Sequence, residues 1–309
     1  MRRWPVLFRA CTLILSILLL SSNTYGQREA ADSPEKPTSL NVGYSIAAFV
    51  DMNTRDAHAL TEVLVELLVR KTGLDLTSEV FMFYDLSSMD EAVRAAKLDV
   101  IILLALEYLE ISDHLTLDPS FVPVMGGEVF DEFLLLVRRD DRMKQLADLE
   151  KRKLMAGGSA GSSVPLLWLD TMLMKEGLPP GKEFFSSIHE AKKAAQAVLP
   201  VFFGQADACV VLRRDFETMV ELNPQVGETL VIQRVSPGFL RGLICIRKGY
   251  GYRDLAKRSF AELHSDPSGR QLLALFRVDK LIPFDPSYLE SVRGLFREYR
   301  ALRKGRRER

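Results

Sequence analysis

Small residues and serines fill the segment Gly157–Ser163, GGSAGSS, between an apolar strand-like run and an apolar helical pattern. A strand that ends in small residues ahead of a helix leaves free backbone N–H groups at the positive end of the helix dipole, where anions bind. The hydroxyls of Ser162 and Ser163 can add donors, and Gly161 lets a ligand approach the backbone. The alternative is an ordinary serine N-cap after a glycine turn. The segment therefore indicates either an anion site or a capped helix.

The same segment also fits the G-x-S-x-G pattern of serine hydrolases, with Ser159 as the nucleophile. Asp215 and His264 follow it in the order that such a triad requires. Against this interpretation, AELHSDPSG around His264 is typical of a surface helix end, and no oxyanion-loop motif precedes Ser159. We therefore expect no enzyme activity and keep the hydrolase as the least favoured alternative.

The first 26 residues have the order of an export signal. Three arginines precede an uncharged apolar run at residues 10–20, which is shorter than the about 20 residues that a membrane-spanning helix needs. Small residues follow up to Gly26, as in a cleaved signal peptide. We expect cleavage after Gly26, a polar leader over residues 27–37 and a periplasmic product. The alternative is an uncleaved membrane anchor.

The composition is that of a globular protein. The 309 residues hold 41 Lys and Arg against 41 Asp and Glu, and 47% are hydrophobic, which excludes a disordered chain and any global attraction to nucleic acid. Three cysteines and four histidines leave little material for a structural zinc site, so we expect no metal and no cofactor. Cys209 and Cys245 lie in strand-like runs, either as a disulfide or as buried thiols.

Strands and helices alternate along the chain, which predicts an α/β fold with a largely parallel sheet. In the first half, a helix over residues 54–71 has one apolar face and ends at Gly73, and Ser88–Glu91 is typical of a capping box. In the second half, a helix over residues 189–203, kinked at Pro200, starts at His189. Strands are expected at residues 40–44, 80–84, 99–104, 132–138, 153–156, 208–212, 230–235 and 243–247.

This alternation occurs twice, which predicts two lobes. We assign residues 38–135 and 240–309 to lobe 1 and residues 136–239 to lobe 2. EFLLLVR (132–138) and GLICIRK (242–248) are the candidate strands that cross between them as hinges. A C-terminal helix follows the Asp285-Pro286 cap, and its basic end is expected to be a solvated tail.

Six segments follow one another along residues 38–300. They are LNVG, LLVRKTGLDL, MDEAVRAAKLDVIILLALEYLE, LADLEKRKLMAGGSAGSSVPLLWL, IHEAKKAAQAVLPVFFGQADACVV and HSDPSGRQLLALFRVDKLIPFDPSYLESVRGLF. In this order they resemble the phosphonate/phosphite substrate-binding proteins of ABC importers. The resemblance implies a type II periplasmic-binding fold, in which two mixed, mostly parallel sheets flanked by helices are joined by hinge strands.

The resemblance also implies a ligand site. In lobe 2 it favours the anion site at Gly161, Ser162 and Ser163, and it places His189 where the family has a histidine that contacts the phosphonate. A surface histidine is the alternative for His189. In lobe 1 the segments that supply ligand contacts contribute two tyrosines and a serine. The expected ligand-binding set is Tyr44, Ser45, Tyr108, Gly161, Ser162, Ser163 and His189.

Three departures from the family pattern bear on the ligand. Gly161 replaces a hydroxyl residue, and Leu212 occupies the position of an acidic residue that holds a ligand amine, which argues against an aminophosphonate. The run Leu103–Leu106 makes the lobe 1 half of the pocket more apolar. Arg213 and Arg214, next to Leu212, either add positive charge or form a solvated surface pair. The ligand is then a larger organic anion, or high-affinity binding for transport has been lost.

The sequence as a whole predicts a monomeric extracytoplasmic solute-binding protein. It would capture a small or medium anionic ligand, phosphonate-like or another organic oxyanion, and deliver it to an ABC permease. The alternative is a ligand-sensing role, since lobes of this type also serve as sensing inputs. The sequence shows no kinase or cyclase segment, so such a sensor would act as the periplasmic partner of a separate membrane signalling protein.

Overall fold

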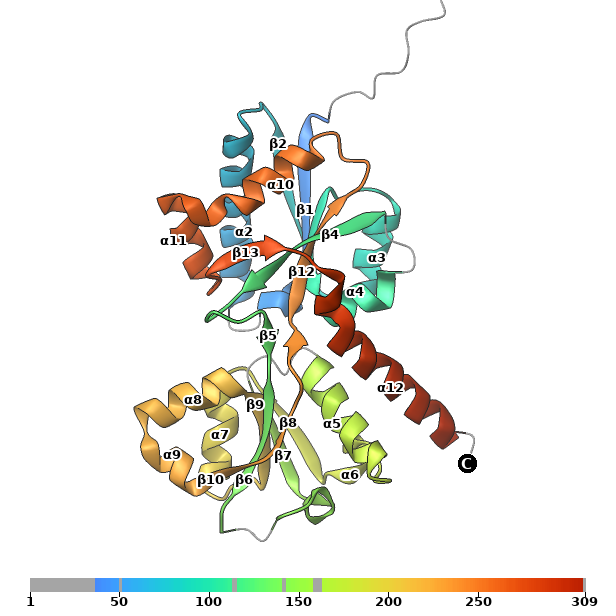
Figure 1. The fold of residues 1–309 in the computed structure, drawn as a ribbon, viewed down its shortest axis with the longest axis vertical. Coiled ribbons are helices and arrows are strands. Elements are labelled where there is room, and N and C mark those ends of the chain that lie inside the picture. Colours follow the sequence, from blue (N-terminus) through green and yellow to red (C-terminus); the bar gives the residue numbers. More distant parts are fainter. Residues whose placement is uncertain (1–36, 50–51, 113–115, 141–142, 158–162, 308–309) are drawn as a thin grey trace, which may run out of the picture. The chain divides into compact units, whose positions relative to one another are not determined.

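Two mixed sheets carry the fold in the computed structural model, which describes residues 37–49, 52–112, 116–140, 143–157 and 163–307 (Figure 1). The larger sheet has six strands in the order β13-β4-β12-β3-β1-β2. Its strands are β1 (Ser39–Ser45), β2 (Thr77–Phe83), β3 (Val100–Leu104), β4 (Leu117–Val124), β12 (Gly242–Arg247) and β13 (Lys280–Pro283). Strands β1, β2 and β3 run parallel, while β12 lies antiparallel to both β3 and β4.

The second sheet has five strands in the order β10-β6-β9-β7-β8. They are β6 (Phe133–Arg138), β7 (Lys153–Gly157), β8 (Ser187–Ala191), β9 (Ala208–Leu212) and β10 (Leu230–Val235). Strands β7, β8 and β9 are parallel, and β6 is antiparallel to β9. Both sheets belong to one contact unit, Thr38–Arg309.

Helices flank both sheets, as the alternating pattern predicts. The helices are α2 (Thr54–Thr72), α3 (Leu86–Arg94), α4 (Ala105–Ile111), α5 (Ser163–Lys175), α6 (Gly181–Phe184), α7 (Ala194–Phe202), α8 (Arg213–Leu222), α9 (Pro224–Thr229), α10 (Arg253–Ala261), α11 (Pro267–Leu275) and α12 (Glu290–Arg307). Short 3-10 turns lie at η1 (Ile46–Phe49), η3 (Leu146–Leu149), η5 (Leu263–Ser265) and η6 (Pro286–Leu289). Helix α2 packs on β2 and also contacts the helices α10 and α11. Helix α7 packs on β7 and β9.

The helix ends follow from local chemistry. Gly73 ends α2 with a φ of 68°, a conformation that glycine adopts without steric cost, and its N–H bonds the carbonyl of Arg70. Helix α3 begins earlier than expected, because the carboxylate of Asp85, not the side chain of Ser88, accepts the N–H of Ser88. The capping box predicted at Ser88–Glu91 is therefore wrong, and the cap lies three residues upstream.

The region around His189 differs most from the sequence-based expectation. His189 lies within strand β8, paired with Met155 of β7, and α7 begins only at Ala194. The expected helix start at His189 is therefore wrong. Of the alanines that suggested a helix from residue 189, Ala191 ends β8, and only those from Ala194 onward lie in α7. Gly204, with a φ of 70°, ends that helix region as expected.

A pair of two-residue strands, β5 (Phe130–Asp131) and β11 (Phe239–Leu240), links the two sheets. We expected EFLLLVR and GLICIRK to cross. Instead, β6 belongs wholly to the five-stranded sheet and β12 to the six-stranded sheet, so the crossing is made by the β5/β11 ribbon that precedes each of them. Hinge strands exist, but they are shorter than the runs that the sequence suggested.

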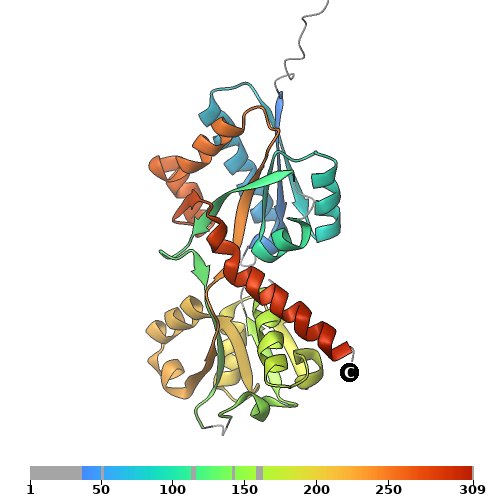
Figure 2. The ribbon, with the colours of Figure 1, turned by 45° about the vertical axis from the view of Figure 1, so that its right-hand side comes forward.

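The C-terminal helix α12 contacts both halves of the fold. It follows η6 and touches α4 beside the six-stranded sheet, and it then packs along α5 beside the five-stranded sheet (Figures 1 and 2). Glu298 lies 2.9 Å from Lys175, and Arg306 donates to the carbonyl of Leu178 at 2.7 Å. The end expected to be a solvated tail is thus helical to Arg307, and its contacts do not place it on lobe 1 alone.

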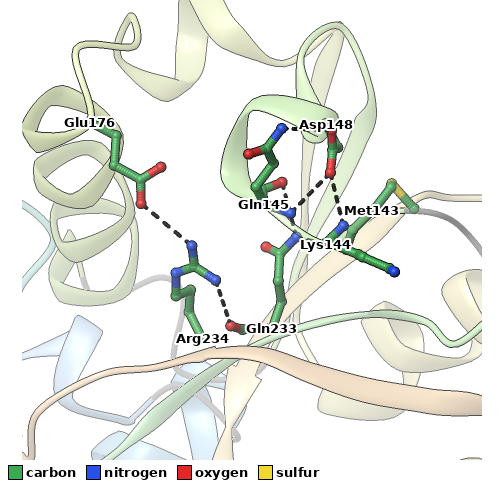
Figure 3. Close-up of polar contacts among 7 residues, drawn as sticks. All are labelled: Met143, Lys144, Gln145, Asp148, Glu176, Gln233 and Arg234. Atoms are coloured by element: carbon green, nitrogen blue, oxygen red, sulfur yellow. Dashed lines mark hydrogen bonds and ion pairs between the residues drawn. The ribbon is translucent and has the colours of Figure 1, made fainter.

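One polar cluster fixes the edge of the five-stranded sheet. Gln233 sits at an irregularity in the pairing of β10 with β6, and its amide donates to the carbonyls of Met143 and Gln145 (Figure 3). Asp148 accepts the backbone N–H groups of residues 144 and 145, which rigidifies the same turn (Figure 3). The connection that leads into β7 is therefore tied to the edge strand.

The two described cysteines are both buried and free, Cys209 in β9 and Cys245 in β12. They lie in different sheets, so they are buried free thiols and do not form the disulfide that was the other alternative. Among the described residues, no helix combines the length and apolar character needed to cross a bilayer.

Candidate functional site

The carboxyl ends of three parallel strands meet at one edge of the five-stranded sheet. Strand β7 ends at Gly157 and β8 at Ala191, which is its register partner, while β9 ends at Leu212. Helix α5 starts after β7, Lys192 and Lys193 lead from β8 into α7, and Arg213 and Arg214 open α8 after β9. Helix N-termini and basic side chains therefore gather at this edge, an arrangement that attracts anions.

Close packing behind this edge depends on Gly157. A Cβ atom added there would lie 2.5 Å from the Cβ of Ala197 in α7 and 3.3 Å from the Cα of Ala194. The absent side chain lets the first turn of α7 approach the end of β7. The start of α7, with exposed Lys193 as its N-cap residue, is thereby held beside the end of β7.

The predicted lobe 2 residues fall unevenly on this edge. Gly161 and Ser162 lie outside the described residues, and so does Ser159 of the hydrolase alternative. Ser163 is the first residue of α5, and its side chain is not among those described. His189 is exposed on the edge strand β8, two residues before the strand ends, and Lys192 and Lys193 follow that end.

On the six-stranded sheet, the equivalent edge is formed by the ends of β1 and β3. Ser45, at the end of β1, is buried and donates its hydroxyl to Glu107 Oε1 at 2.6 Å. The other oxygen of Glu107 accepts the N–H of Leu104 at 2.8 Å. Burial raises the pKa of Glu107, while these two hydrogen bonds act in the opposite direction. The hydroxyl of Ser45 is thus committed to a carboxylate of the protein.

The two predicted tyrosines lie on different elements, Tyr44 in β1 and Tyr108 in α4. Tyr44 is fully buried, stacks edge-on with Phe49 at 5.1 Å between ring centres, and has its hydroxyl 3.3 Å from Nδ1 of His58. Burial raises the pKa of Tyr44 to about 12. Tyr108 is half-buried on α4, packed against the larger core cluster. In this conformation Tyr44 offers no surface to a ligand, and no described contact joins it to Tyr108.

Arginines gather where the chain passes from one sheet to the other. Asp131 of β5 is buried and accepts hydrogen bonds from Arg214 at 2.5 Å and from Arg241 at 2.6 Å. Arg214 also donates to the carbonyl of Met125 at 3.1 Å. Arg213 instead pairs with Glu132 at 2.5 Å. The sequence did not decide whether Arg214 supplies positive charge to a ligand or forms a solvated surface pair with Arg213. It gave no indication of a role for Arg241.

A hollow of about 160 Å³ lies against these arginines, and we call it the arginine pocket. Its lining comprises Met125, Gly126, Leu212, Arg214, Asp215, Arg241 and Arg277. Three guanidinium groups, those of Arg214, Arg241 and Arg277, and one carboxylate, that of Asp215, belong to this lining. Arg277 adopts a φ of 57° after α11, in a turn whose sequence carries no glycine to mark it. Guanidinium groups donate strong hydrogen bonds to oxyanions, so this lining suits an anionic ligand.

Leu212 lies in this lining, at the position where an acidic group was expected for an aminated ligand. Its side chain is buried and apolar, as the sequence implied. Asp207, at the start of the same strand region, accepts the N–H of Lys153 at 2.8 Å and so serves the sheet. Among the described residues, no group of three or more His, Cys, Asp or Glu side chains is arranged to hold a metal ion.

Comparisons with known proteins agree with this geometry. Residues 46–289 match the family described as periplasmic substrate-binding proteins of phosphonate ABC transporters. No curated protein matches the chain. A solved binding protein component of an ABC phosphonate transporter from Pseudomonas aeruginosa is 17% identical, with a TM-score of 0.61, over 87% of this chain and 88% of that one.

Two further solved structures share the fold. XAC2383 from Xanthomonas citri, bound to ATP, is 16% identical with a TM-score of 0.64 over 86% of this chain and 98% of that one. PhnD1 from Prochlorococcus marinus, in complex with methylphosphonate, is 15% identical with a TM-score of 0.59 over 85% and 98%. At sequence identities this low, the structural similarity establishes the fold alone. It confirms the type II periplasmic-binding architecture.

The family match covers most of the chain and confirms the resemblance carried by the six segments. Proteins of this family bind small molecules and deliver them to membrane permeases. Two α/β halves joined by a short ribbon, with basic groups at the strand ends, are the framework that such capture requires. The chain therefore belongs to the periplasmic substrate-binding proteins of ABC phosphonate transporters.

Proposed function

We propose that this protein captures a small or medium-sized organic oxyanion, with a phosphonate-like head group, and presents it to an ABC permease. The observation that supports the head group is the gathering of α5, Lys193 and Arg214 at one sheet edge, where an anion that loses its water regains donors. Solved proteins of this fold bound to methylphosphonate and to ATP are consistent with phosphorus oxyanions of different size.

In this proposal, Ser162 and Ser163 hold the charged end at the start of α5. Lys193 takes the place first considered for His189, because it opens α7 while His189 lies back along β8. The arginine pocket supplies the remaining positive charge. Ser45 acts indirectly by orienting Glu107, and Tyr44 supports the packing behind η1.

Calorimetry of the mature protein with methylphosphonate, inorganic phosphate and methanesulfonate tests the head group. We expect saturable binding of at least one of them, strongest for the phosphorus oxyanions. Lys193→Gln should weaken it by about tenfold or more, since one charge-assisted hydrogen bond is worth about 1.5–3 kcal/mol. Lys182→Gln, at an exposed position on α6, is the matched control. Absence of binding for all three anions would overturn the proposal.

The lobe boundaries and the processing of the chain belong to the same proposal. We place one lobe at residues 38–132 with 240–289, and the other at residues 133–239, with α12 shared between them. We also propose export as a monomer after cleavage near Gly26. Intact-mass and sedimentation measurements on exported protein test this, and a full-length species in the membrane fraction would contradict it.

A further inference from the structure

A second hollow, of about 110 Å³, lies in the half of the fold built on the six-stranded sheet, and we call it the apolar pocket. Its floor is formed by strands β3 and β12, and its walls by η1, α2, α11 and the start of β13. Apart from Arg241, its side chains are uncharged, and most are aliphatic or aromatic, as Phe49, Leu273 and Phe276 illustrate.

The apolar pocket adjoins the arginine pocket. Met125 and Arg241 belong to the linings of both hollows, so the two share a wall. Leu103 and Leu104, at the end of β3, line the apolar pocket. A ligand that contacts Arg241 from the arginine pocket therefore has an apolar space next to it.

Such a space is unfavourable when empty, because its lining atoms lose dispersion contacts that a packed core would provide. Water is a poor occupant of the apolar pocket, because a bound water molecule needs two to four hydrogen-bonding partners and the lining residues offer few. The volume approaches the about 150 Å³ of a cavity that accepts benzene, so it suits an apolar group of roughly three to five carbon atoms.

We propose that the natural ligand is an amphiphilic anion whose short alkyl or aryl substituent occupies the apolar pocket while its head group contacts the arginines. This inference rests on the proposed function for the head group and adds the class of substituent. It also gives a physical role to the leucines at the end of β3, which line the floor and edge of this pocket.

The test is calorimetry of the mature protein with n-alkyl series, methyl to hexyl, carrying phosphonate, sulfonate or carboxylate heads. Each added methylene should tighten binding about fourfold, the equivalent of about 0.8 kcal/mol, until the pocket is full. Beyond that length the gain should stop. The position of this break reports the capacity of the pocket.

Two substitutions address the pocket itself. Ala48→Leu narrows it and should shorten the optimal chain while leaving the methyl member unaffected, and Ala47→Leu, next to it on η1 but outside the lining, is the control. Val278→Ala widens the pocket and should lengthen the optimal chain by about one carbon. Thermal unfolding verifies that each variant is folded.

The outcomes separate the two proposals. A chain-length gain with sulfonates or carboxylates but not with phosphonates would retain the apolar subsite and overturn the phosphonate head group. Binding of methylphosphonate with no gain on lengthening would retain the head group and overturn the apolar subsite. If no member of any series binds, or if Ala47→Leu shifts the optimum as much as Ala48→Leu, the apolar subsite is also overturned.

Discussion

Asp131 joins Arg214 and Arg241 by accepting one hydrogen bond on each of its carboxylate oxygens. Arg214 opens α8 beside the five-stranded sheet, while Arg241 directly precedes β12 of the six-stranded sheet. One carboxylate on the β5/β11 ribbon therefore fixes a side chain from each half of the fold. Because Asp131 is only 6% exposed, this contact is shielded from solvent in a way that the outer ion pairs are not.

Asp131→Asn should lower the free energy of unfolding by about 1–3 kcal/mol. Breaking a buried ion pair costs about 3–5 kcal/mol, but the two arginines are 20% and 33% exposed, so solvent reduces the loss. Urea denaturation measures it. Glu132→Gln, which removes a partner of Arg213 that is more exposed than Asp131, is the control and should change stability by less than about 1 kcal/mol. Equal effects would show that burial of Asp131 contributes nothing.

Replacing Ser162 and Ser163 together by alanine should weaken anion binding at least about tenfold without abolishing it. Two side-chain donors are lost, and about 1.4 kcal/mol corresponds to one decade of affinity, while backbone donors at the start of α5 remain. Calorimetry with the anion that binds wild type checks this. Ser186→Ala, at an exposed position before β8, controls for the loss of a hydroxyl. Unchanged affinity in the folded double variant would place the charged end elsewhere.

Glu107→Gln should be more stable than wild type at pH 7, and this difference should vanish as the pH falls below about 4.5. The pKa of Glu107 is raised by burial, so the residue contributes most to stability when protonated, and that contribution is lost as the pH rises through the raised pKa. Glutamine stays neutral and can accept from Leu104 N–H while donating to Ser45.

Urea unfolding of both proteins between pH 4 and pH 8 measures this difference. Glu66→Gln, at an exposed position of α2, accounts for the loss of one negative charge. A stability difference that does not depend on pH would contradict the role assigned to the buried carboxyl of Glu107.

Apolar packing, rather than ion pairing, should hold α12 in place. Leu295→Ala should cost about 2–5 kcal/mol, because the side chain is buried in the larger core cluster. Lys175→Gln should cost less than about 1 kcal/mol, because the Lys175–Glu298 pair is about half exposed on both sides. Denaturation midpoints of the two variants compare these effects directly. A larger loss from Lys175→Gln would reverse the assignment.

Cys209 and Cys245 should be unreactive in the native protein. Burial raises the pKa of both thiols, so neither supplies the thiolate that reacts. A thiol reagent should therefore label both residues only after denaturation, without prior reduction. Labelling that requires a reductant would mean that the two cysteines are paired.

Strongly patterned elements were predictable from the sequence. Strand β9 lies where the buried run of residues 208–212 placed it, and α2 has the expected apolar face and glycine stop. Strand β4 was missed because Pro119 and Pro123 lack the N–H that a ladder needs, which argues against a strand inside a sheet. The strand nevertheless pairs with both β12 and β13, with an irregularity next to Pro119.

The site was less predictable, because it depends on pairings between distant segments. Nothing local to Arg241 or Arg277 indicates that each lines the same hollow as Arg214. His189 was misplaced because helical alanine spacing extends backward from Ala194 without a marked boundary, although Lys192 and Lys193 separate the strand from the helix. Ser45 has a hydroxyl of the right type, but only the fold shows that Glu107 already receives it.

The path of α12 constrains how this molecule can move. A body joined to another by the β5/β11 ribbon alone could swing and twist in any direction. The packing of α12 along α5, with Arg306 bonded to Leu178 at its far end, adds a second attachment well separated along the chain. Because α12 also contacts β11, the helix and the ribbon form one connected link between the two halves. Any movement of one half relative to the other must therefore also bend α12 or shift its packing on α5.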